Sequence, residues 1–297
     1  MAKQTPNIHG ALLVDKPAGF TSHDLVNVVR QKLGTKKVGH AGTLDPDATG
    51  LMLVGVGFGT KLLEYSVGCD KTYEAEITFG TATSTLDASG EVTETVDMSD
   101  LAPEAVKEAA LKFVGDIKQV PPMVSALKVD GKRLHELARE GKTVERKARQ
   151  VTVSEFTISE TDDPLVYKAT VTCSSGTYIR TLADDLGRAL GGVAHLSGLR
   201  RTKVGRFDVS GAVALDDVSV DNLLGAETLL SDASLVPLPE ELVAKVRNGQ
   251  TLDLSTAEGI VALTDQGNLI AVYRSVDGKL KPEKVAPNSE APRTNQY

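Results

Sequence analysis

The chain has 297 residues, with 41% hydrophobic and 25% charged residues, which is ordinary for a globular protein of one large and one small domain. Its two cysteines are too few for a disulfide framework or a cysteine-based zinc site. No apolar stretch approaches the roughly 18 residues of a membrane span, and aromatic residues make up only 4%, without a Trp, which excludes an aromatic RNA platform. We therefore expect a cytoplasmic protein.

The net charge of −7 argues at first against a nucleic-acid partner, but a ligand responds to the local field. The segment 118–150 holds nine Lys or Arg and four acids, a local charge of +5. A second basic run follows later in the chain and comprises Arg200, Arg201, Lys203 and Arg206. Each run alone reads as a solvated face, whereas two runs on an acidic chain favour a polyanionic partner.

The first elements are a strand and a helix. Residues 10–15 (GALLVD) predict a short strand that ends in a turn at 16–19. Thr21 or Ser22 can cap the N-terminus of a helix that Gly34 ends, with its apolar side chains on one face.

A loop and two strands follow. Residues 35–50, rich in Gly, Thr, Asp and Pro, predict a loop, and 51–57 predict a buried strand. A short helix is expected over 61–66. Apolar and polar side chains alternate over 71–80, which predicts a strand with one solvated face.

The middle of the chain is more polar. A turn region (81–100) precedes a helix from Pro103 to Phe113. Prolines and glycines interrupt the basic segment 118–150, which we interpret as an excursion from the core with a short helix around Leu134–Arg139.

Regular elements then resume. Strands are predicted over 150–158 and 165–173, and a helix over 177–190 has its apolar residues on one side. A strand-like 205–213 and a helix near 215–230 close the large domain.

The pattern changes near Leu235. A short helix (241–249) and two strands (259–265 and 269–275) predict a small second domain, and the tail from Pro282 is expected to be disordered.

These elements predict an α+β fold, with a mixed, largely antiparallel sheet flanked by helices. The domains are expected at 1–230, with 118–150 as an insertion, and at 231–297.

The stretch GHAGTLDPDATG (39–50) contains the candidate for chemistry. Pro46 holds the preceding Asp45 out of the helical conformation, and a carboxylate on a stiff loop between a helix and a buried strand suits nucleophilic work. Asp47 could act as a partner or second acid. The alternative is that Asp45 caps its own turn.

Other chemistries find no support. No phosphate-binding loop or dinucleotide fingerprint is present, and the five His residues show no metal-ligand spacing. Ser22, His23 and Asp24 are consecutive, so their side chains diverge on a helix and cannot form a triad.

Six blocks occur in an order that resembles the TruB family, the bacterial enzymes that make pseudouridine at position 55 in the T-loop of tRNA. They span about residues 9 to 210 and read GALLVDKPAGFTSHD, KVGHAGTLDPDATGLMLVGVGFGTKLL, KTYEAEITFG, QVPPMVSALKVDGKRLHELAREG, CSSGTYIRTLADDLG and AHLSGLRRTKVGRF. The resemblance implies a pseudouridine-synthase core and a small C-terminal PUA-like domain.

The resemblance also implies site residues. Asp45 would be the catalytic aspartate, and Arg180 the cation that keeps it ionised. Tyr73 would stack on the target base and assist proton removal, with Tyr178 and Leu199 lining the nucleotide pocket. Without the family, each of these side chains except Asp45 reads as ordinary packing or surface.

Further residues would bind or support the RNA site. His40 would fill the space vacated by the flipped base, and Lys16 and Pro17 would support the site structurally. Segment 118–150 resembles the family's mobile thumb. The expected contacts with the RNA backbone are Lys128, Lys132, Arg133, Arg146, Arg200 and Arg201.

The implied reaction breaks the N1–C1′ bond, rotates the uracil and joins C5 to C1′. The carboxylate could attack the base, attack the sugar or stabilise charge at C1′, and the sequence does not choose. We expect an isomerase without cofactor or metal.

Two positions depart from the family pattern. Asp47 adds a negative charge beside the nucleophile, so we expect it to point outward. Ser175 replaces a common Lys, which would weaken one RNA contact.

The expected partner is the T-arm of tRNA, with no membrane, guide RNA or protein partner, and the chain is expected to be a monomer. Three other interpretations remain: a tRNA-folding chaperone without catalysis, a guide-RNA-dependent pseudouridine synthase, and a hydrolase using Asp45 and Asp47. A chaperone role could also coexist with catalysis.

Overall fold

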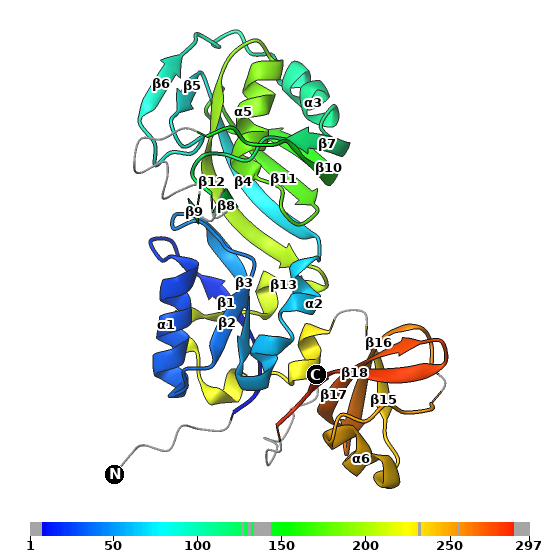
Figure 1. The fold of residues 1–297 in the computed structure, drawn as a ribbon. Helices are drawn as coiled ribbons and strands as arrows, with labels where there is room; N and C mark the ends of the chain where they lie inside the picture. Colours follow the sequence, from blue (N-terminus) through cyan, green and yellow to red (C-terminus); the bar gives the residue numbers. More distant parts are fainter. Residues whose placement is uncertain are drawn as a thin grey trace. The chain divides into compact units, whose positions relative to one another are not determined.

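The computed structural model describes residues 8–125, 128–129, 132–133, 144–230, 233–254 and 256–287. The chain divides into two compact units. The first unit comprises Met1–Pro46, Gly50–Gly68 and Gly205–Tyr297, and the second comprises Asp47–Thr49 and Cys69–Val204. Figure 1 shows the elements of both units in chain colours.

The first unit contains a group of paired strands, with the buried strand β3 (Thr49–Val56) at its centre. β3 pairs antiparallel with β1 (Gly10–Lys16) and with β2 (Val38–Ala41), and β14 (Val213–Ala214) runs parallel to β1. The expectation of a continuous loop over 35–50 is therefore wrong at β2. Four residues with a Gly and a His give no period of their own, and their pairing with β3 makes them a strand.

The helix α1 (Ser22–Leu33) follows β1 as predicted. Thr21 caps it and forms a capping box with Asp24, which satisfies donors at the helix N-terminus. Gly34 ends it in the left-handed conformation, with φ of 64°. Both ends of α1 are thus fixed by local sequence.

The predicted helix near 215–230 is wrong. The segment forms three separate 3-10 turns, η3 (Leu215–Asp217), η4 (Val220–Asn222) and η5 (Ala226–Leu229). Ser219 accepts and donates hydrogen bonds with Asn222 and starts a new turn, because short polar side chains compete with the helix for backbone groups. The remaining short elements are η1 (Gly57–Lys61), α2 (Glu64–Val67), β13 (Phe207–Asp208) and η2 (Val209–Gly211).

The second unit contains a five-stranded antiparallel sheet. Its strands, in spatial order, are β7 (Gly115–Gln119), β10 (Arg149–Glu160), β11 (Val166–Cys173), β4 (Lys71–Phe79) and β12 (Ala194–Val204). The odd-numbered residues of β4 are buried while the even-numbered ones are not. The alternation predicted for this strand is confirmed.

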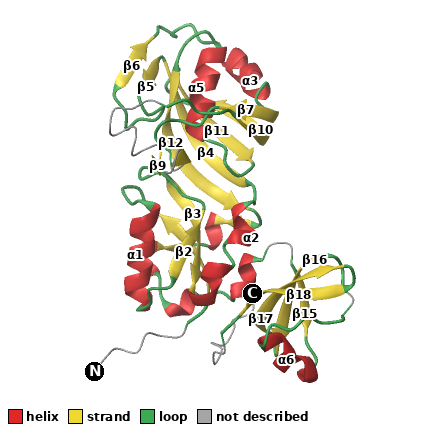
Figure 2. Ribbon diagram, in the orientation of Figure 1, coloured by secondary structure: helices red, strands yellow, loops and turns green. Residues whose placement is uncertain are grey.

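Two helices cover this sheet (Figure 2). α5 (Ile179–Ala189) packs on β12 and β4, and α3 (Pro103–Leu111) packs on β10 and against α5. The polar region after β4 contains the hairpin β5 (Thr81–Thr83) and β6 (Val92–Thr95). The two short strands β8 (Lys128–Val129) and β9 (Lys132–Arg133) pair with each other.

A four-stranded sheet lies near the C-terminus. β15 (Ser234–Pro237), β16 (Gly259–Asp265), β17 (Asn268–Val276) and β18 (Lys279–Val285) form it, with α6 (Glu240–Arg247) beside it. Its own core includes Val246, Val261, Leu263, Tyr273 and Leu280.

The expectation of disorder from Pro282 is wrong up to Val285, because β18 includes both residues. A proline is tolerated there because β18 is the edge strand of its sheet. The expected tail from residue 288 onward and the expected helix at Leu134–Arg139 lie outside the described residues.

The predicted α+β class with a mixed, largely antiparallel sheet is confirmed. Within the described part of the chain, no helix is both long and apolar enough to cross a bilayer. The expected boundary near residue 230 stays a prediction.

Gly187 lets α5 approach the start of β12. A Cβ there would lie 2.4 Å from the backbone nitrogen of Ala194, so Gly187→Ala must displace backbone. We expect a loss of about 1–3 kcal/mol in the free energy of unfolding, although alanine favours helices. Urea denaturation measures this loss, and Arg188→Ala, a substitution of an exposed residue, is the control. An unchanged or raised free energy of unfolding for Gly187→Ala would contradict the prediction.

Candidate active site

The predicted site residues belong to both compact units. The first unit carries Lys16, Pro17, His40 and Asp45. The second unit carries Tyr73, Tyr178, Arg180, Leu199, Arg200 and Arg201. Each set has its own local supports.

Lys16 braces the loop that carries Asp45. Its side chain is fully buried, and the ammonium donates to the carbonyl oxygens of Pro17 (2.9 Å), Phe20 (2.7 Å) and Pro46 (3.0 Å). The backbone of Gly19 also donates to the Pro46 carbonyl, over 3.0 Å. One buried cation therefore ties the turn after β1 to the residue that follows Asp45, which is what a structural support requires.

The other side of Asp45 is held by the start of α1. The Ser22 hydroxyl donates to the Leu44 carbonyl (3.0 Å) and accepts from the Leu44 amide (2.9 Å). Asp45 itself is half-buried, whereas Asp47 is exposed. The exposed position agrees with the outward direction expected for Asp47, and water there screens its charge.

Of the remaining residues of the first unit, Pro17 is exposed and His40 is half-buried on β2, opposite Val54 of β3. The register therefore fixes where the backbone of His40 lies.

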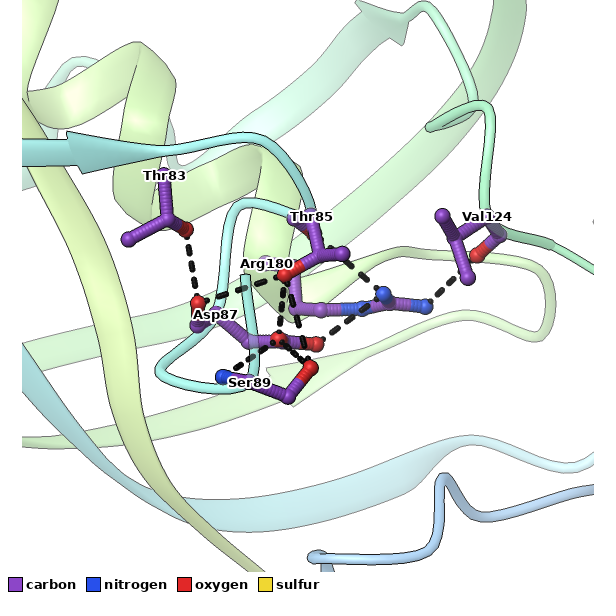
Figure 3. Close-up of polar contacts among 6 residues, drawn as sticks. All are labelled: Thr83, Thr85, Asp87, Ser89, Val124 and Arg180. Carbon is purple, nitrogen blue, oxygen red and sulfur yellow. Dashed lines mark hydrogen bonds and ion pairs between the residues drawn. The ribbon is translucent and has the colours of Figure 1, made fainter. Parts of the chain in front are cut away.

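Arg180 begins α5 and is buried, with 5% of its surface exposed. Figure 3 shows its guanidinium between the Thr83–Ser89 loop and Val124. Nη1 forms an ion pair with Asp87 Oδ2 (3.0 Å) and donates to the Thr85 carbonyl (3.3 Å), while Nη2 donates to the Val124 carbonyl (2.9 Å). The guanidinium is thus fixed by acceptors from two other segments.

Asp87 is a site residue that the sequence analysis missed. Burial alone would raise its pKa, but hydrogen bonds from Ser89 and Thr85 and the Arg180 charge hold the pKa below its usual value. The Thr85 hydroxyl (2.6 Å) and the Ser89 amide (3.1 Å) both donate to Oδ1. The pattern Thr-x-Asp-x-Ser, which favours such local side-chain bonds, is the signal that could have found it.

Gln119 is a second residue that was missed. It is buried, and its amide bonds both backbone groups of Tyr178: Oε1 accepts from the nitrogen (2.9 Å) and Nε2 donates to the carbonyl (3.1 Å). Tyr178 precedes α5, so Gln119 holds the start of the helix that carries Arg180.

Tyr73 lies on β4, which pairs with β12, the strand that carries Leu199, Arg200 and Arg201. Tyr73 is buried on β4, and Leu199 and Arg200 are half-buried on β12. Arg201 is only 1% exposed and lies directly opposite Tyr73. The sequence predicted that Arg201 contacts the RNA backbone, but the folded protein buries this side chain.

The basic segment is described in part. Lys128 pairs with Arg133 in the backbone register of β8 and β9, which also contains Lys132. Arg146 is half-buried, and its Nη1 donates to the Pro121 carbonyl (2.9 Å). Arg146 therefore holds the chain where the segment leaves β7.

A cavity of about 330 Å³ adjoins this network in the second unit. Its lining includes Thr85, Val124, Thr181, Asp184 and Asp185. Burial and the neighbouring Asp184 raise the pKa of Asp185 to about 6. The basic Arg146 lines the same cavity, so its lining carries both signs of charge.

Within the residues that the structure describes, no three His, Cys, Asp or Glu side chains are grouped as metal ligands. What the two units offer is a braced half-buried carboxylate in one and a fixed guanidinium and a buried tyrosine in the other. Such groups can stabilise charge and hold a planar base.

Comparison with known proteins gives consistent matches. Residues 30–179 match the model of the TruB family pseudouridylate synthase N-terminal domain, and 180–242 match that of the tRNA pseudouridylate synthase B C-terminal domain. The chain is 44% identical to tRNA pseudouridine synthase B of Cupriavidus metallidurans, over 94% of both chains. It is 43% identical to the protein of that name from Mycobacterium ulcerans, over 92% of this chain and 93% of that one.

Solved structures resemble the chain as well. A Cbf5–Nop10–Gar1 complex contains a chain with a TM-score of 0.69 and 25% identity, matched over 94% of this chain and 85% of that one. An H/ACA RNP bound to a substrate RNA containing 2′-deoxyuridine gives a TM-score of 0.71 at 22% identity, over the same shares. This second likeness shows a shared fold.

Asp87→Asn is expected to destabilise the protein by about 3 kcal/mol near pH 7, because it leaves a buried guanidinium without its carboxylate. The pKa of Asp87 is lowered in the folded state. Its contribution is therefore present above the unfolded pKa and lost as the pH falls through the folded pKa. The difference between variant and wild type should shrink below about pH 4.

Urea denaturation at pH 7 and pH 3 tests this. The matched control is Asp97→Asn, an exposed aspartate whose pKa is lowered by hydrogen bonds from Ser99. A difference for Asp87→Asn that stays constant over this pH range would refute the electrostatic explanation.

Proposed function

Because the chain belongs to the TruB family of pseudouridylate synthases, which are isomerases, we propose that it converts uridine to pseudouridine at position 55 in the T-loop of tRNA. The observation that carries this is the identity of 42–44% to proteins named tRNA pseudouridine synthase B, over more than nine-tenths of the chain. The sequence blocks that resemble the family contain Asp45, Tyr73 and Arg180.

The proposed reaction rearranges one nucleotide. The N1–C1′ bond breaks, the uracil turns, C5 joins C1′, the proton on C5 leaves and N1 gains a proton. No atom is added or removed overall, so we propose that neither a cofactor nor a metal takes part. The detached base must be held throughout, which requires a site that excludes water.

Asp45 is proposed as the catalytic carboxylate and Arg180 as its counter-charge. Two observations support this pairing of roles. The Asp45 loop is braced by Lys16 and Ser22, and the Arg180 guanidinium is fixed by Asp87 and two carbonyl groups. Groups that are positioned before the substrate arrives need no reorganisation in the transition state.

The base-binding residues are proposed from the family motifs. Tyr73 would stack on the uracil, with Tyr178 and Leu199 lining the pocket, and His40 would occupy the space the base leaves. Flipping the base out of the T-loop costs a few kcal/mol, and stacking on Tyr73 would offset part of it. Lys16 and Pro17 would act as structural support.

The RNA backbone would be bound by the basic side chains. Segment 118–150 is proposed as a thumb-like insertion that contributes Lys128, Lys132, Arg133 and Arg146, while Arg200 contributes from β12. Phosphate contacts would give position and salt dependence but no sequence readout.

The domain assignment follows the same proposal. Residues 1–230 would form the catalytic domain, and 231–297 a small PUA-like domain, whose separate core is consistent with it. We propose a monomer in the cytoplasm that acts without a guide RNA and can also assist tRNA folding. A guide-RNA-dependent pseudouridine synthase remains the alternative.

The first test is tritium release from tRNA labelled at C5 of uracil. Each turnover replaces the C5–H bond by C5–C1′, so wild type alone should release tritium to water. Asp45→Asn should lower the single-turnover rate roughly a thousand-fold or more, since it removes the reacting carboxylate.

Asp47→Asn is the matched control, because Asp47 is two residues away and exposed, and it should keep the wild-type rate. Release that requires an added RNA would favour the guide-dependent alternative. No release under either condition would contradict the enzymatic proposal, and release by Asp45→Asn at the wild-type rate would contradict the assigned carboxylate. A minimal T-arm hairpin serves as substrate to test independence from the rest of the tRNA.

A second test concerns the phosphate contacts. If Arg200 binds a phosphate, Arg200→Gln should weaken tRNA binding and reduce the slope of log K against log salt by about 1. Filter binding over a salt series measures the slope. Lys107→Gln is the control, because Lys107 is exposed on α3 and paired with Glu160; an equal change in both variants would contradict a specific contact at Arg200.

A further inference from the structure

Two neighbouring arginines of β12 have opposite environments. Arg200 is half-buried, and its Nη1 lies 3.4 Å from the Thr49 hydroxyl. Arg201 is 1% exposed. Successive side chains of a strand point to opposite faces of the sheet, so the two arginines cannot have the same role.

The strand register shows what faces Arg201. Its Cα partner on β4 is Tyr73, whereas Arg200 is opposite the exposed Glu74. Both side chains are buried on the same face of the sheet and are cross-strand neighbours. Burial lowers the pKa of Arg201, and its interaction with Tyr73 opposes this lowering. A bulge in β12 follows directly after Arg201, and bulges of this kind redirect side chains next to functional sites.

A second cation lies close to this pair. Lys71, two residues before Tyr73 on the same buried face of β4, is 6% exposed and donates to the Cys69 carbonyl. Burial lowers the pKa of Lys71, and the charge of Arg201 lowers it further.

Burying one cation costs several kcal/mol, and burying two close together costs more. Apolar residues would fill this interior at lower cost, so stability alone does not account for an arginine at position 201. A hydrogen-bond donor placed beside the phenol of Tyr73 does account for it.

We propose that Arg201 is a positioning residue for Tyr73. Its guanidinium fixes the phenol through the hydroxyl, so that the ring is locked as the platform for the detached uracil. Arg201 is thus not a phosphate contact. This rests on the proposed function of Tyr73, and it adds a residue that acts on the base only through that side chain.

A lock of this kind affects the chemical step more than tRNA binding. A ring free to turn can still admit the base, but it no longer holds the base where C5 meets C1′. Arg201→Met should therefore lower the single-turnover rate at saturating tRNA about ten-fold to a hundred-fold, as expected for losing a charge-assisted hydrogen bond. The tRNA dissociation constant and its salt slope should stay as in wild type.

The decisive experiment is a double-mutant cycle with Tyr73→Phe, followed by tritium release. If Arg201 acts through the hydroxyl, Tyr73→Phe and Arg201→Met should each lower the rate by a similar factor. The double variant should then be no slower than either single one. Arg201→Lys, which keeps a cationic donor, should recover part of the rate. The control Glu76→Gln changes an exposed residue of β4 and should keep the wild-type rate.

Stability is followed in the same variants. Tyr73→Phe removes the hydroxyl partner of the buried guanidinium and should lower the thermal midpoint. Adding Arg201→Met should restore the midpoint, because an apolar pair replaces the polar one. Where Arg201→Met alone fails to fold, the double variant and Arg201→Lys still give rates to compare with Tyr73→Phe.

Four outcomes would overturn the inference. These are a wild-type rate for Arg201→Met, rate losses that multiply in the double variant, a full rate for Tyr73→Phe beside a slow Arg201→Met, and a reduced salt slope for Arg201→Met like that predicted for Arg200→Gln. Absence of tritium release by wild type would instead contradict the proposed function itself, so the two failures are distinguishable.

Discussion

The guanidinium of Arg180 is the constraint on which the described site of the second unit depends. Asp87 and the Val124 carbonyl accept its hydrogen bonds from two segments that are far apart in the sequence. A guanidinium is planar and its donors have fixed directions, so satisfying it fixes where the loop before β6 and the chain after β7 lie against the start of α5. The same bonds keep the cation oriented before any substrate arrives.

Buried cations recur through the molecule although its net charge is −7. Lys16, Lys71, Arg180 and Arg201 are all at most 6% exposed. Backbone carbonyls satisfy much of this charge: three accept from Lys16, two from Arg180 and one from Lys71. A carbonyl oxygen lowers the cost of burying a cation without neutralising it, whereas the Asp87 carboxylate compensates the charge of Arg180. Net charge therefore describes the surface of this protein and says little about its interior.

The sequence predicted those elements whose signals are local. The capping box and Gly34 mark both ends of α1, and the alternation over β4 needs no partner to be recognised. Elements made by pairing were missed: β2 exists because β3 lies beside it, and β18 continues through Pro282 because it is an edge strand. The supports of Arg180 were missed for the same reason, since Asp87 is 93 residues away in sequence and only folding brings the two together.

The basic run at 200–206 shows why family motifs alone leave roles undecided. The sequence groups Arg200 and Arg201 as one cationic patch, yet a strand sends adjacent side chains to opposite faces. The face to which each side chain of β12 points cannot be counted from the sequence, because the bulges after Leu196 and Arg201 shift the register. The register against β4 resolves it: Arg200 is opposite exposed Glu74 and Arg201 opposite buried Tyr73. An arginine on the solvated side can exchange counterions for phosphates at little cost. One on the buried side has lost its hydration, so its charge acts on its buried neighbours, and the residue directly opposite Arg201 is the buried Tyr73.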